Sequence, residues 1–178
     1  FKSVTDAPIL TDPVVTLPNA VAEYEIAHIR FDATSTTPVV LFHSLYGISS
    51  IHHCVAYQRG TGDGFKFEYI ASASVYDNFT FNADYVTPVK GASRTGVGFN
   101  FIQGYGGGLP VFERNSARGF LTGFVIDGAA GGLVDDYSPL IFHNEASTVY
   151  NGFIITEEVN KARVCHNYLE GEIGRAHV

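Results

Sequence analysis

The sequence contains no tryptophan, no methionine and only two cysteines, and charged residues make up 16% of it, against about 25% in a typical soluble domain. Basic residues are scarce: 11 Lys and Arg stand against 18 Asp and Glu, which gives a net charge of −7. This balance argues against nucleic acid or an anionic membrane as the main partner. Apolar runs such as 38–42 are also far too short to span a bilayer. We therefore predict no nucleic-acid partner and no membrane span.

What the chain does contain is enough apolar residues for one core: 46% of its 178 residues are hydrophobic. No charged segment followed by an apolar stretch opens the chain, which starts at Phe1, so we expect any export signal to have been removed. The triplet Asn78-Phe79-Thr80 is a glycosylation sequon and predicts a glycan on Asn78. Sparse charge together with this sequon favours an extracellular, glycosylated protein.

The two cysteines, Cys54 and Cys165, leave two alternatives open. A disulfide between them would close a loop of 165 − 54 = 111 residues, which stabilises by roughly 4–5 kcal/mol in the chain-entropy model. Two buried free thiols that pack as small hydrophobic side chains are the other alternative.

Residues 1–19 differ from the rest because they carry Pro8, Pro13 and Pro18 among apolar residues. Proline fixes φ and removes a backbone donor, so we expect an extended arm rather than a helix or a central strand. Its mostly apolar face consists of Ala7, Ile9, Thr11, Val15 and Leu17. Such an arm packs along the edge of its own domain or is donated to a neighbouring subunit.

From residue 20 onward, apolar residues alternate with a period of two, which indicates β-strands. The alternation is clearest over 65–75, 79–85 and 95–101, and turn residues separate such segments at short intervals. Many short strands in one domain predict an all-β fold, a single jelly-roll-like β-sandwich over 20–171. The recurring Phe-x-Phe pairs at 65–67, 79–81 and 99–101 are expected to point into the core between its sheets. Asn151-Gly152 forms either a turn or a bulge inside one strand.

Motifs that carry chemistry are scarce. Neighbouring residues of a strand point to opposite faces, so His52 and Cys54 could share a face but His53 could not, and we predict no metal site there. The chain lacks a Gly-x-Ser-x-Gly nucleophile motif, and we expect it not to be an enzyme and to need no cofactor. The candidate ligands for a calcium ion are Asp127, Asp135 and Asp136, which flank a glycine-rich stretch; solvated loop acids are the commoner alternative. Tyr105, in its own glycine-rich loop, is the best candidate for stacking on a sugar ring.

The last residues, 172–178, read Glu-Ile-Gly-Arg-Ala-His-Val and resemble the translation of a sequencing adapter, so we expect the natural sequence to differ beyond Gly171. The arm followed by a β-domain resembles strand-complemented filament subunits, of which bacterial pilins are the familiar case. It is also similar in kind to the glycosylated filament proteins of fresh water called lotus-pond filaments.

This resemblance implies a structural subunit of an extracellular helical filament, a homopolymer in which each arm is donated to the neighbouring β-sandwich. The alternative function is a monomeric extracellular carbohydrate-binding or adhesion module, with glycans as partners.

Overall fold

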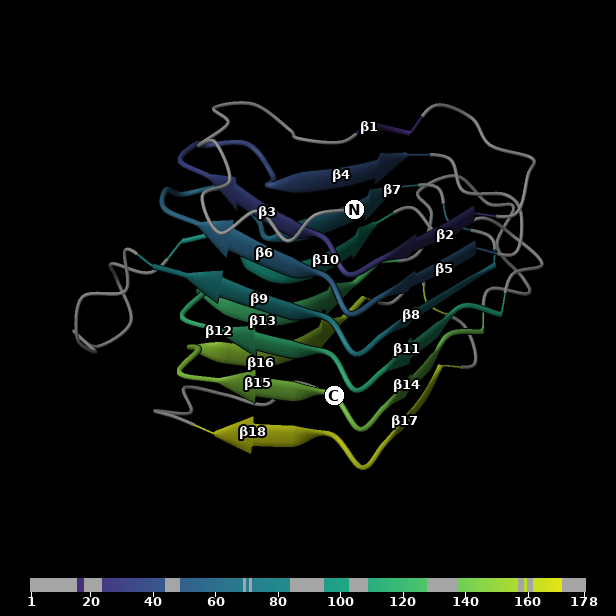
Figure 1. Cartoon of the computed structure of the whole chain (residues 1–178). Helices are drawn as coiled ribbons and strands as arrows, with labels where there is room; N and C mark the ends of the chain where they lie inside the picture. Colours follow the sequence, from purple (N-terminus) through teal and green to yellow (C-terminus); the bar gives the residue numbers. More distant parts are fainter. Residues whose placement is uncertain are drawn as a thin grey trace.

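The computed structural model describes residues 16–17, 24–43, 49–68, 70, 72–83, 95–102, 109–127, 138–156, 159 and 162–170. Regular structure in these ranges consists of short strands, which form three six-stranded sheets in which every pairing is parallel (Figure 1). The part of the chain that the structure describes has no helix long and apolar enough to cross a lipid bilayer.

Each sheet takes every third strand of the chain. Sheet 1 contains β1 (Thr16–Leu17), β4 (Val40–His43), β7 (Phe65–Glu68), β10 (Val97–Ile102), β13 (Thr122–Ile126) and β16 (Asn151–Ile155). Sheet 2 contains β2 (Tyr24–Ala27), β5 (Ser49–His52), β8 (Ala73–Tyr76), β11 (Val111–Glu113), β14 (Leu140–Phe142) and β17 (Arg163–Cys165). Sheet 3 contains β3 (Arg30–Ala33), β6 (Val55–Gln58), β9 (Phe79–Asn82), β12 (Ser116–Arg118), β15 (Glu145–Ser147) and β18 (Tyr168–Glu170).

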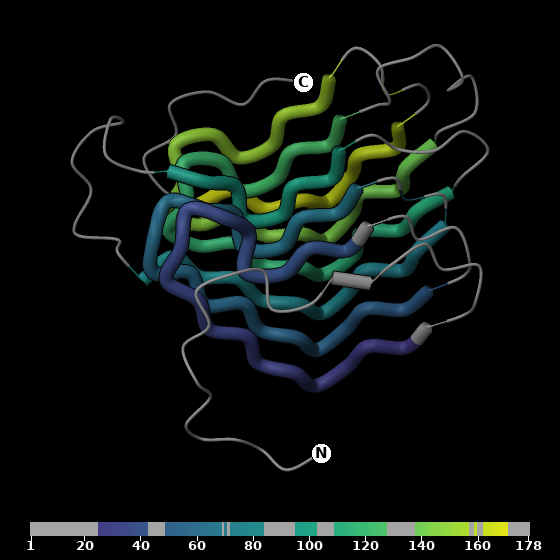
Figure 2. Tube along the Cα trace, turned by 90° about the horizontal axis from the view of Figure 1, so that it is seen from above, coloured from purple at the N-terminus to yellow at the C-terminus, as the bar shows by residue number. Residues whose placement is uncertain are grey.

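Three consecutive strands therefore make one turn of a β-solenoid, and we number these turns coil 1 (β1–β3) to coil 6 (β16–β18). Successive coils run alongside one another from the purple to the yellow end of the chain (Figure 2). Equivalent residues of neighbouring coils lie one strand spacing apart, about 4.8 Å, so each position of the coil becomes a column along the molecule.

The predicted jelly-roll β-sandwich is wrong, although the all-β class is confirmed. A sandwich pairs strands largely through antiparallel hairpins, whereas here β7 pairs in parallel with β4 and β10, the strands one coil away. The expected strand over 65–75 is two strands, β7 and β8, in different sheets. Period-two alternation indicates a strand with one buried face, but it does not indicate which other strand pairs with it. The pattern is therefore the same in a sandwich and in a solenoid.

The core is a set of phenylalanine columns from sheet 1. Phe65, Phe99, Phe124 and Phe153 stack in sequence, with ring centroids 5.3, 5.0 and 4.7 Å apart. The parallel register places each ring over the equivalent ring of the previous coil. Two of the three Phe-x-Phe pairs thus point inward as predicted, and Asn151-Gly152 lies inside β16 rather than in a turn.

The third pair departs from the prediction: Phe79 and Phe81 are half-buried on the outer face of sheet 3, while Thr80 and Asn82 between them are buried. The inner face of sheet 3 instead carries small side chains that allow sheet 1 to approach closely. A Cβ built on Gly98 would lie 2.5 Å from the Ala117 Cβ, closer than any ordinary contact. Large inward side chains on this stretch of sheet 3 would not fit beside sheet 1.

The end of the predicted N-terminal arm belongs to the solenoid of its own chain. Thr16 and Leu17 form β1 and pair in parallel with Leu41 and Phe42 of β4. The backbone pairing of this stretch is thus within its own chain, and the described residues form a solenoid in place of the β-sandwich that was expected to accept the arm. The remaining arm residues, Ala7, Ile9, Thr11 and Val15, lie outside the described residues.

Candidate functional site

A two-residue corner joins sheet 2 to sheet 3 in every coil, and its first residue always has a positive φ. These φ values lie between 51° and 58°. Together the six residues form what we call the corner column: His28, His53, Asp77, Arg114, His143 and His166.

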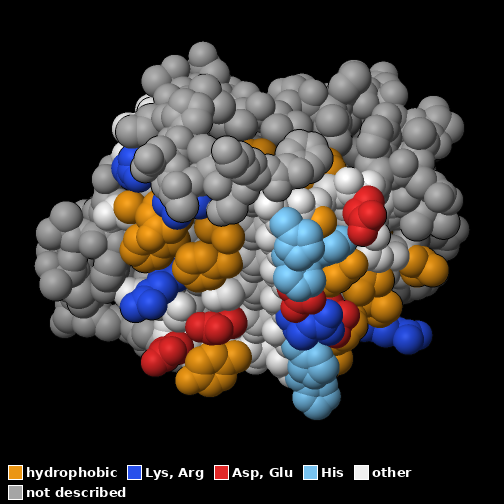
Figure 3. Space-filling view, viewed as in Figure 1, with side chains coloured by type: hydrophobic (Ala, Val, Ile, Leu, Met, Phe, Trp, Pro, Cys, Tyr) orange, Lys and Arg blue, Asp and Glu red, His pale blue; other side chains and the backbone are white. Residues whose placement is uncertain are grey.

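The left-handed backbone conformation directs these side chains outward and turns the chain sharply with only two residues. Histidine and aspartate tolerate it better than most side chains, which helps to explain their presence here. All six side chains are exposed or half-buried. They appear in Figure 3 as a line of pale-blue histidines interrupted by a red and blue cluster.

Beneath the corner column, the second corner residue is asparagine in coils 3 to 6. These residues form an asparagine ladder, in which Asn78, Asn115 and Asn144 are buried and Asn167 is half-buried. In Asn115, Asn144 and Asn167 the side-chain oxygen accepts hydrogen bonds from the backbone N–H and the Nδ2 of the asparagine one coil earlier, as Asn115 Oδ1 does from Asn78, at 3.2 and 3.0 Å. Asn78 Oδ1 accepts instead from the backbone N–H of Cys54, at 3.0 Å. Each Nδ2 also donates to a backbone carbonyl of the previous coil, as Asn78 does to Ile51 at 2.8 Å. The ladder satisfies polar groups that the tight corner would otherwise bury without partners.

The middle of the corner column is an ion pair. Arg114 donates through Nε and Nη2 to the two carboxylate oxygens of Asp77, at 2.7 and 2.9 Å, and Nη1 donates to Glu113. The Arg114 hydrogen bonds lower the pKa of Asp77 below its ordinary value, although partial burial acts in the opposite direction. The same pairing raises the pKa of Arg114, so both groups are charged at neutral pH.

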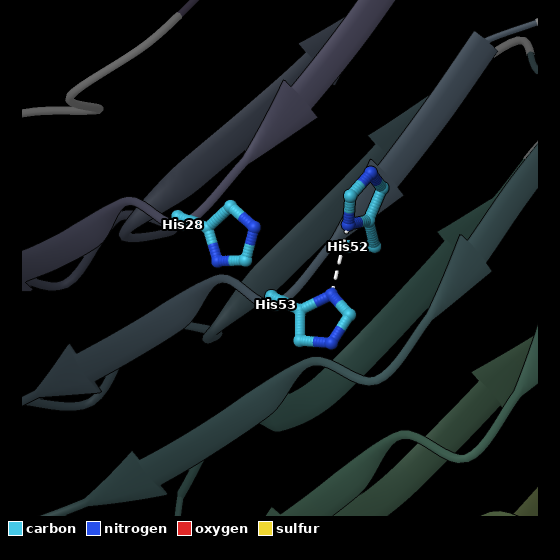
Figure 4. Close-up of side chains that lie close together, drawn as sticks. All are labelled: His28, His52 and His53. Atoms are coloured by element: carbon cyan, nitrogen blue, oxygen red, sulfur yellow. Dashed lines mark hydrogen bonds between the residues drawn. The ribbon is translucent and has the colours of Figure 1, made fainter. Parts of the chain in front are cut away.

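The first two coils bring three histidines together (Figure 4). His28 and His53 are neighbours in the corner column, with ring centroids 5.0 Å apart. His52, the last residue of β5, is only 9% exposed and stacks on Tyr76 at 4.7 Å. One ligating nitrogen from each of the three rings lies within 4.8 Å of the others.

Beside the corner, the outer face of sheet 3 carries an aromatic patch made of Val55, Tyr57, Phe79 and Phe81 on β6 and β9. Tyr57 meets Phe81 edge-on, with centroids 5.2 Å apart, and the Arg30 guanidinium lies 4.9 Å from the centre of the Tyr57 ring. This patch is visible as the orange surface on the left of Figure 3, with Lys or Arg and Asp or Glu side chains around it.

The sequon residue Asn78 lies in the ladder rather than at the surface. It is 2% exposed, and both Nδ2 hydrogens are used, one toward Ile51 and one toward Asn115. A glycan on Nδ2 replaces one of these hydrogens and would break one of the two bonds at a buried position, so the expected glycosylation does not fit the folded chain. The expectation treated Asp77-Asn78 as a surface turn, but only Asp77 faces outward.

The two cysteines are free thiols in coils 2 and 6, Cys54 buried and Cys165 exposed. Four strand spacings of about 4.8 Å separate their coils, far more than the roughly 4–7 Å between Cα atoms that a disulfide allows. The disulfide alternative therefore does not fit this fold. Burial raises the pKa of the Cys54 thiol.

Of the residues predicted to bind calcium or a sugar, Asp127 is the one that lies among the described residues. Asp127 follows β13 and accepts a 2.6 Å hydrogen bond from the Thr156 hydroxyl. Tyr105, Asp135 and Asp136 lie outside the described residues.

The sequence does contain a local signal for the corner. An inward apolar residue is followed two positions later by His, Asp or Arg and then usually by Asn, as in Val75-Tyr76-Asp77-Asn78 and Ile141-Phe142-His143-Asn144. The intervals between corners vary from 23 residues (143 to 166) to 37 (77 to 114), which hides the repeat from a search at fixed period.

The prediction of no metal site at His52 and His53 assumed that both lie on one strand. β5 ends at His52, and His53 turns outward in the left-handed conformation beside His28 of the previous coil.

Comparisons of this chain with protein-family models, with curated proteins and with solved structures found no match.

Proposed function

We propose that this protein is a non-enzymatic, extracellular binding module that holds a neutral polysaccharide against the outer face of sheet 3. The observation that carries the proposal is the aromatic patch. Exposing apolar side chains to water on the outer face of a sheet is unfavourable, and a ligand that covers them lowers the free energy. Here three aromatic rings from two neighbouring strands, Tyr57, Phe79 and Phe81, share one such face.

The shape of the surface suits a long, flat ligand. Side chains of parallel strands in register form straight columns, so the patch is a continuation of a sheet surface rather than a cleft. Aromatic rings offer apolar faces to the C–H groups of a sugar ring, and the Tyr57 hydroxyl adds a donor and an acceptor. That hydroxyl makes no hydrogen bond with the residues that the structure describes, so it is available to a ligand.

Charge favours a neutral polysaccharide over a charged one. Arg30, at one border of the patch, is bridged at 3.3 Å to the buried Asp32, so its charge is balanced and this border has no field of one sign. The net charge of −7 repels polyanions such as nucleic acids and acidic glycans.

Affinity electrophoresis of the purified protein through gels containing soluble β-glucan, xylan or mannan, with pull-down on cellulose and chitin, tests the proposal. We expect at least one neutral polysaccharide to retard or retain the protein. The Tyr57→Ala/Phe81→Ala variant is expected to bind about tenfold more weakly, the equivalent of about 1.4 kcal/mol.

Val125→Ala, a half-buried residue on the outer face of sheet 1, is the matched control and should leave binding unchanged. Circular dichroism verifies that each variant is folded. Absence of binding to every polysaccharide, or equal binding by the double variant and the wild type, would overturn the proposal.

A second candidate function is that of a filament subunit, in which copies associate end to end instead of exchanging an arm. The observation that favours it is Val164 of coil 6, which is 40% exposed although its equivalents Ile51, Val75, Phe112 and Ile141 are buried. This column of apolar side chains ends at Val164, which the described residues do not cover. The last coil can therefore act as a template on which a coil of a second copy pairs.

Sedimentation velocity and electron microscopy distinguish this function from the first. Filaments formed by the wild type and lost in Val164→Glu, but kept in Arg163→Glu on the neighbouring exposed residue, would support end-to-end association. A monomer at all concentrations would reject it and leave polysaccharide binding unaffected.

A further inference from the structure

We propose that His28, His52 and His53 form a binding site for a divalent transition-metal ion of the zinc, nickel or copper class. The site joins coil 1 to coil 2 at the corner column, and it is independent of the aromatic patch and of the function proposed for it. Three imidazoles in one cluster suit these metals, whereas calcium and magnesium require oxygen ligands.

The backbone already holds the three rings on the same side of the corner. His28 and His53 have φ values of 58° and 52°, and equivalent positions of adjacent coils bring their rings within 5.0 Å, centroid to centroid. His52 lies edge-on to both, at 5.9 and 5.1 Å, and its stacking on Tyr76 fixes the plane of its ring. Little ordering is left to occur when an ion binds.

Hydrogen bonding sets which nitrogen of His52 is available. Its Nε2 lies 3.1 Å from Glu25 Oε1, and an ionised carboxylate only accepts, so Nε2 carries the hydrogen. In the neutral ring Nδ1 is then an unprotonated acceptor, and it points at His53 Nδ1, 2.8 Å away (Figure 4). A carboxylate that orients a histidine through its second nitrogen is the usual partner of a metal-binding imidazole.

The metal takes the place of the hydrogen between the two Nδ1 atoms, and that hydrogen moves through solvent to Nε2 of His53, so that both rings stay neutral. Zinc–nitrogen bonds of about 2.0–2.1 Å in tetrahedral geometry place two ligand atoms about 3.3 Å apart. His52 Nδ1 and His53 Nδ1 must therefore separate by roughly half an ångström, which the exposed His53 ring can supply by a small rotation. His28, also exposed, turns toward them as the third ligand, and water completes the coordination.

The corner column contains a matched comparison. His143 and His166 are also neighbours in the left-handed conformation, with centroids 5.5 Å apart, and Glu113 lies 4.0 Å from His143. Beside this pair, the position that His52 has next to His53 is taken by Cys165 of coil 6, which forms no three-ligand cluster with the two histidines among the described residues. Among the described residues this pair has no third histidine, so it should bind metal much more weakly.

Isothermal titration of the protein, prepared without a polyhistidine tag, with Zn²⁺, Ni²⁺ and Cu²⁺ tests the site. We expect one ion per chain and a rise in melting temperature with metal concentration, because the folded state alone assembles the three ligands. His28→Asn and His53→Asn are the informative variants, since asparagine also tolerates a positive φ. Each should weaken binding at least tenfold and abolish the rise in melting temperature.

Two further variants separate the ligands from their surroundings. His143→Asn makes the same change at the same kind of corner and should leave affinity unchanged. Glu25→Ala removes the orienting carboxylate, whose side chain is exposed, and should weaken binding while leaving the metal-free melting temperature unchanged. Equal affinity in the wild type and in His28→Asn and His53→Asn, or an equal loss in His143→Asn, would overturn the proposal.

Discussion

Asn144 Oδ1 accepts two hydrogen bonds from Asn115, one from the backbone N–H and one from Nδ2, both at 3.0 Å. The two residues lie at equivalent corners of coils 4 and 5, and this link repeats along the ladder. It ties the coils together at the point where the chain turns most sharply, and it keeps the outward residues of the corner column aligned.

Replacing Asn115 with alanine should destabilise the protein by about 2–4 kcal/mol, because several buried polar groups lose their partners. Asn78 loses its acceptor, and the Val75 carbonyl loses its 2.8 Å donor. Urea unfolding followed by circular dichroism measures the change. Ser116→Ala, at the next residue on the outer face, is the control and should change stability by less than about 0.5 kcal/mol. Equal effects of the two substitutions would show that the ladder carries no special stability.

Gly123→Ala should also destabilise the protein, by about 1–3 kcal/mol, because the new methyl group has no room. Its Cβ would lie 2.6 Å from the Ala146 Cβ and 2.8 Å from the Gly152 carbonyl oxygen. Adding Ala146→Gly removes the first clash only, so thermal unfolding of the double variant should show partial recovery. A neutral Gly123→Ala substitution would mean that sheets 1 and 3 are farther apart than described.

The Asp77–Arg114 pair should make stability depend on acid. Since the folded-state pKa of Asp77 is below its unfolded value, the charged pair stabilises the protein above about pH 4, and this contribution disappears as the pH falls through the folded-state pKa. Asp77→Asn keeps a residue that tolerates positive φ but loses the charge. Its stability deficit relative to the wild type should therefore shrink as the pH falls.

Urea unfolding from neutral pH to about pH 3, with a chelator present to keep the nearby histidines metal-free, measures this deficit. A deficit that stays constant across the range would contradict the assignment. Glu145→Gln, a half-buried carboxylate outside the corner column, is the control for general effects of charge removal.

The two thiols should react at very different rates. Cys165 is exposed and should be alkylated by iodoacetamide within minutes, whereas Cys54 is buried, has a raised pKa and should react only as the protein unfolds. Peptide mass spectrometry during labelling without reductant gives both rates. Two unreactive cysteines that become reactive only after reduction would indicate a disulfide and contradict the coil assignment.

The sequence was sufficient to predict strands but not their partners. Segments such as 79–82 alternate in the same way in a sandwich and in a solenoid, and only long-range register decides between the two. For the same reason the inward orientation predicted for Phe79 and Phe81 was wrong. Alternation does not tell which of the two faces is the core, and here Thr80 and Asn82 are buried and form hydrogen bonds.

The histidine cluster could not be predicted from local sequence patterns either. His28 lies far from His52 and His53 in the chain, and only the stacking of coils 1 and 2 brings them together. The repeated corner motif was the available signal, and its uneven intervals concealed it.

The corner column, the aromatic patch and the histidine cluster all depend on the stacking of coils in register. One measurement tests this stacking most directly. In a ¹⁵N NMR spectrum recorded after transfer to D₂O, the side-chain amide signals of Asn78, Asn115 and Asn144 should persist, because all three are buried in the ladder. Persistence through hours in D₂O is the expected result. Exchange of these signals within the dead time, as for an asparagine in a surface turn, would contradict the ladder and with it the solenoid.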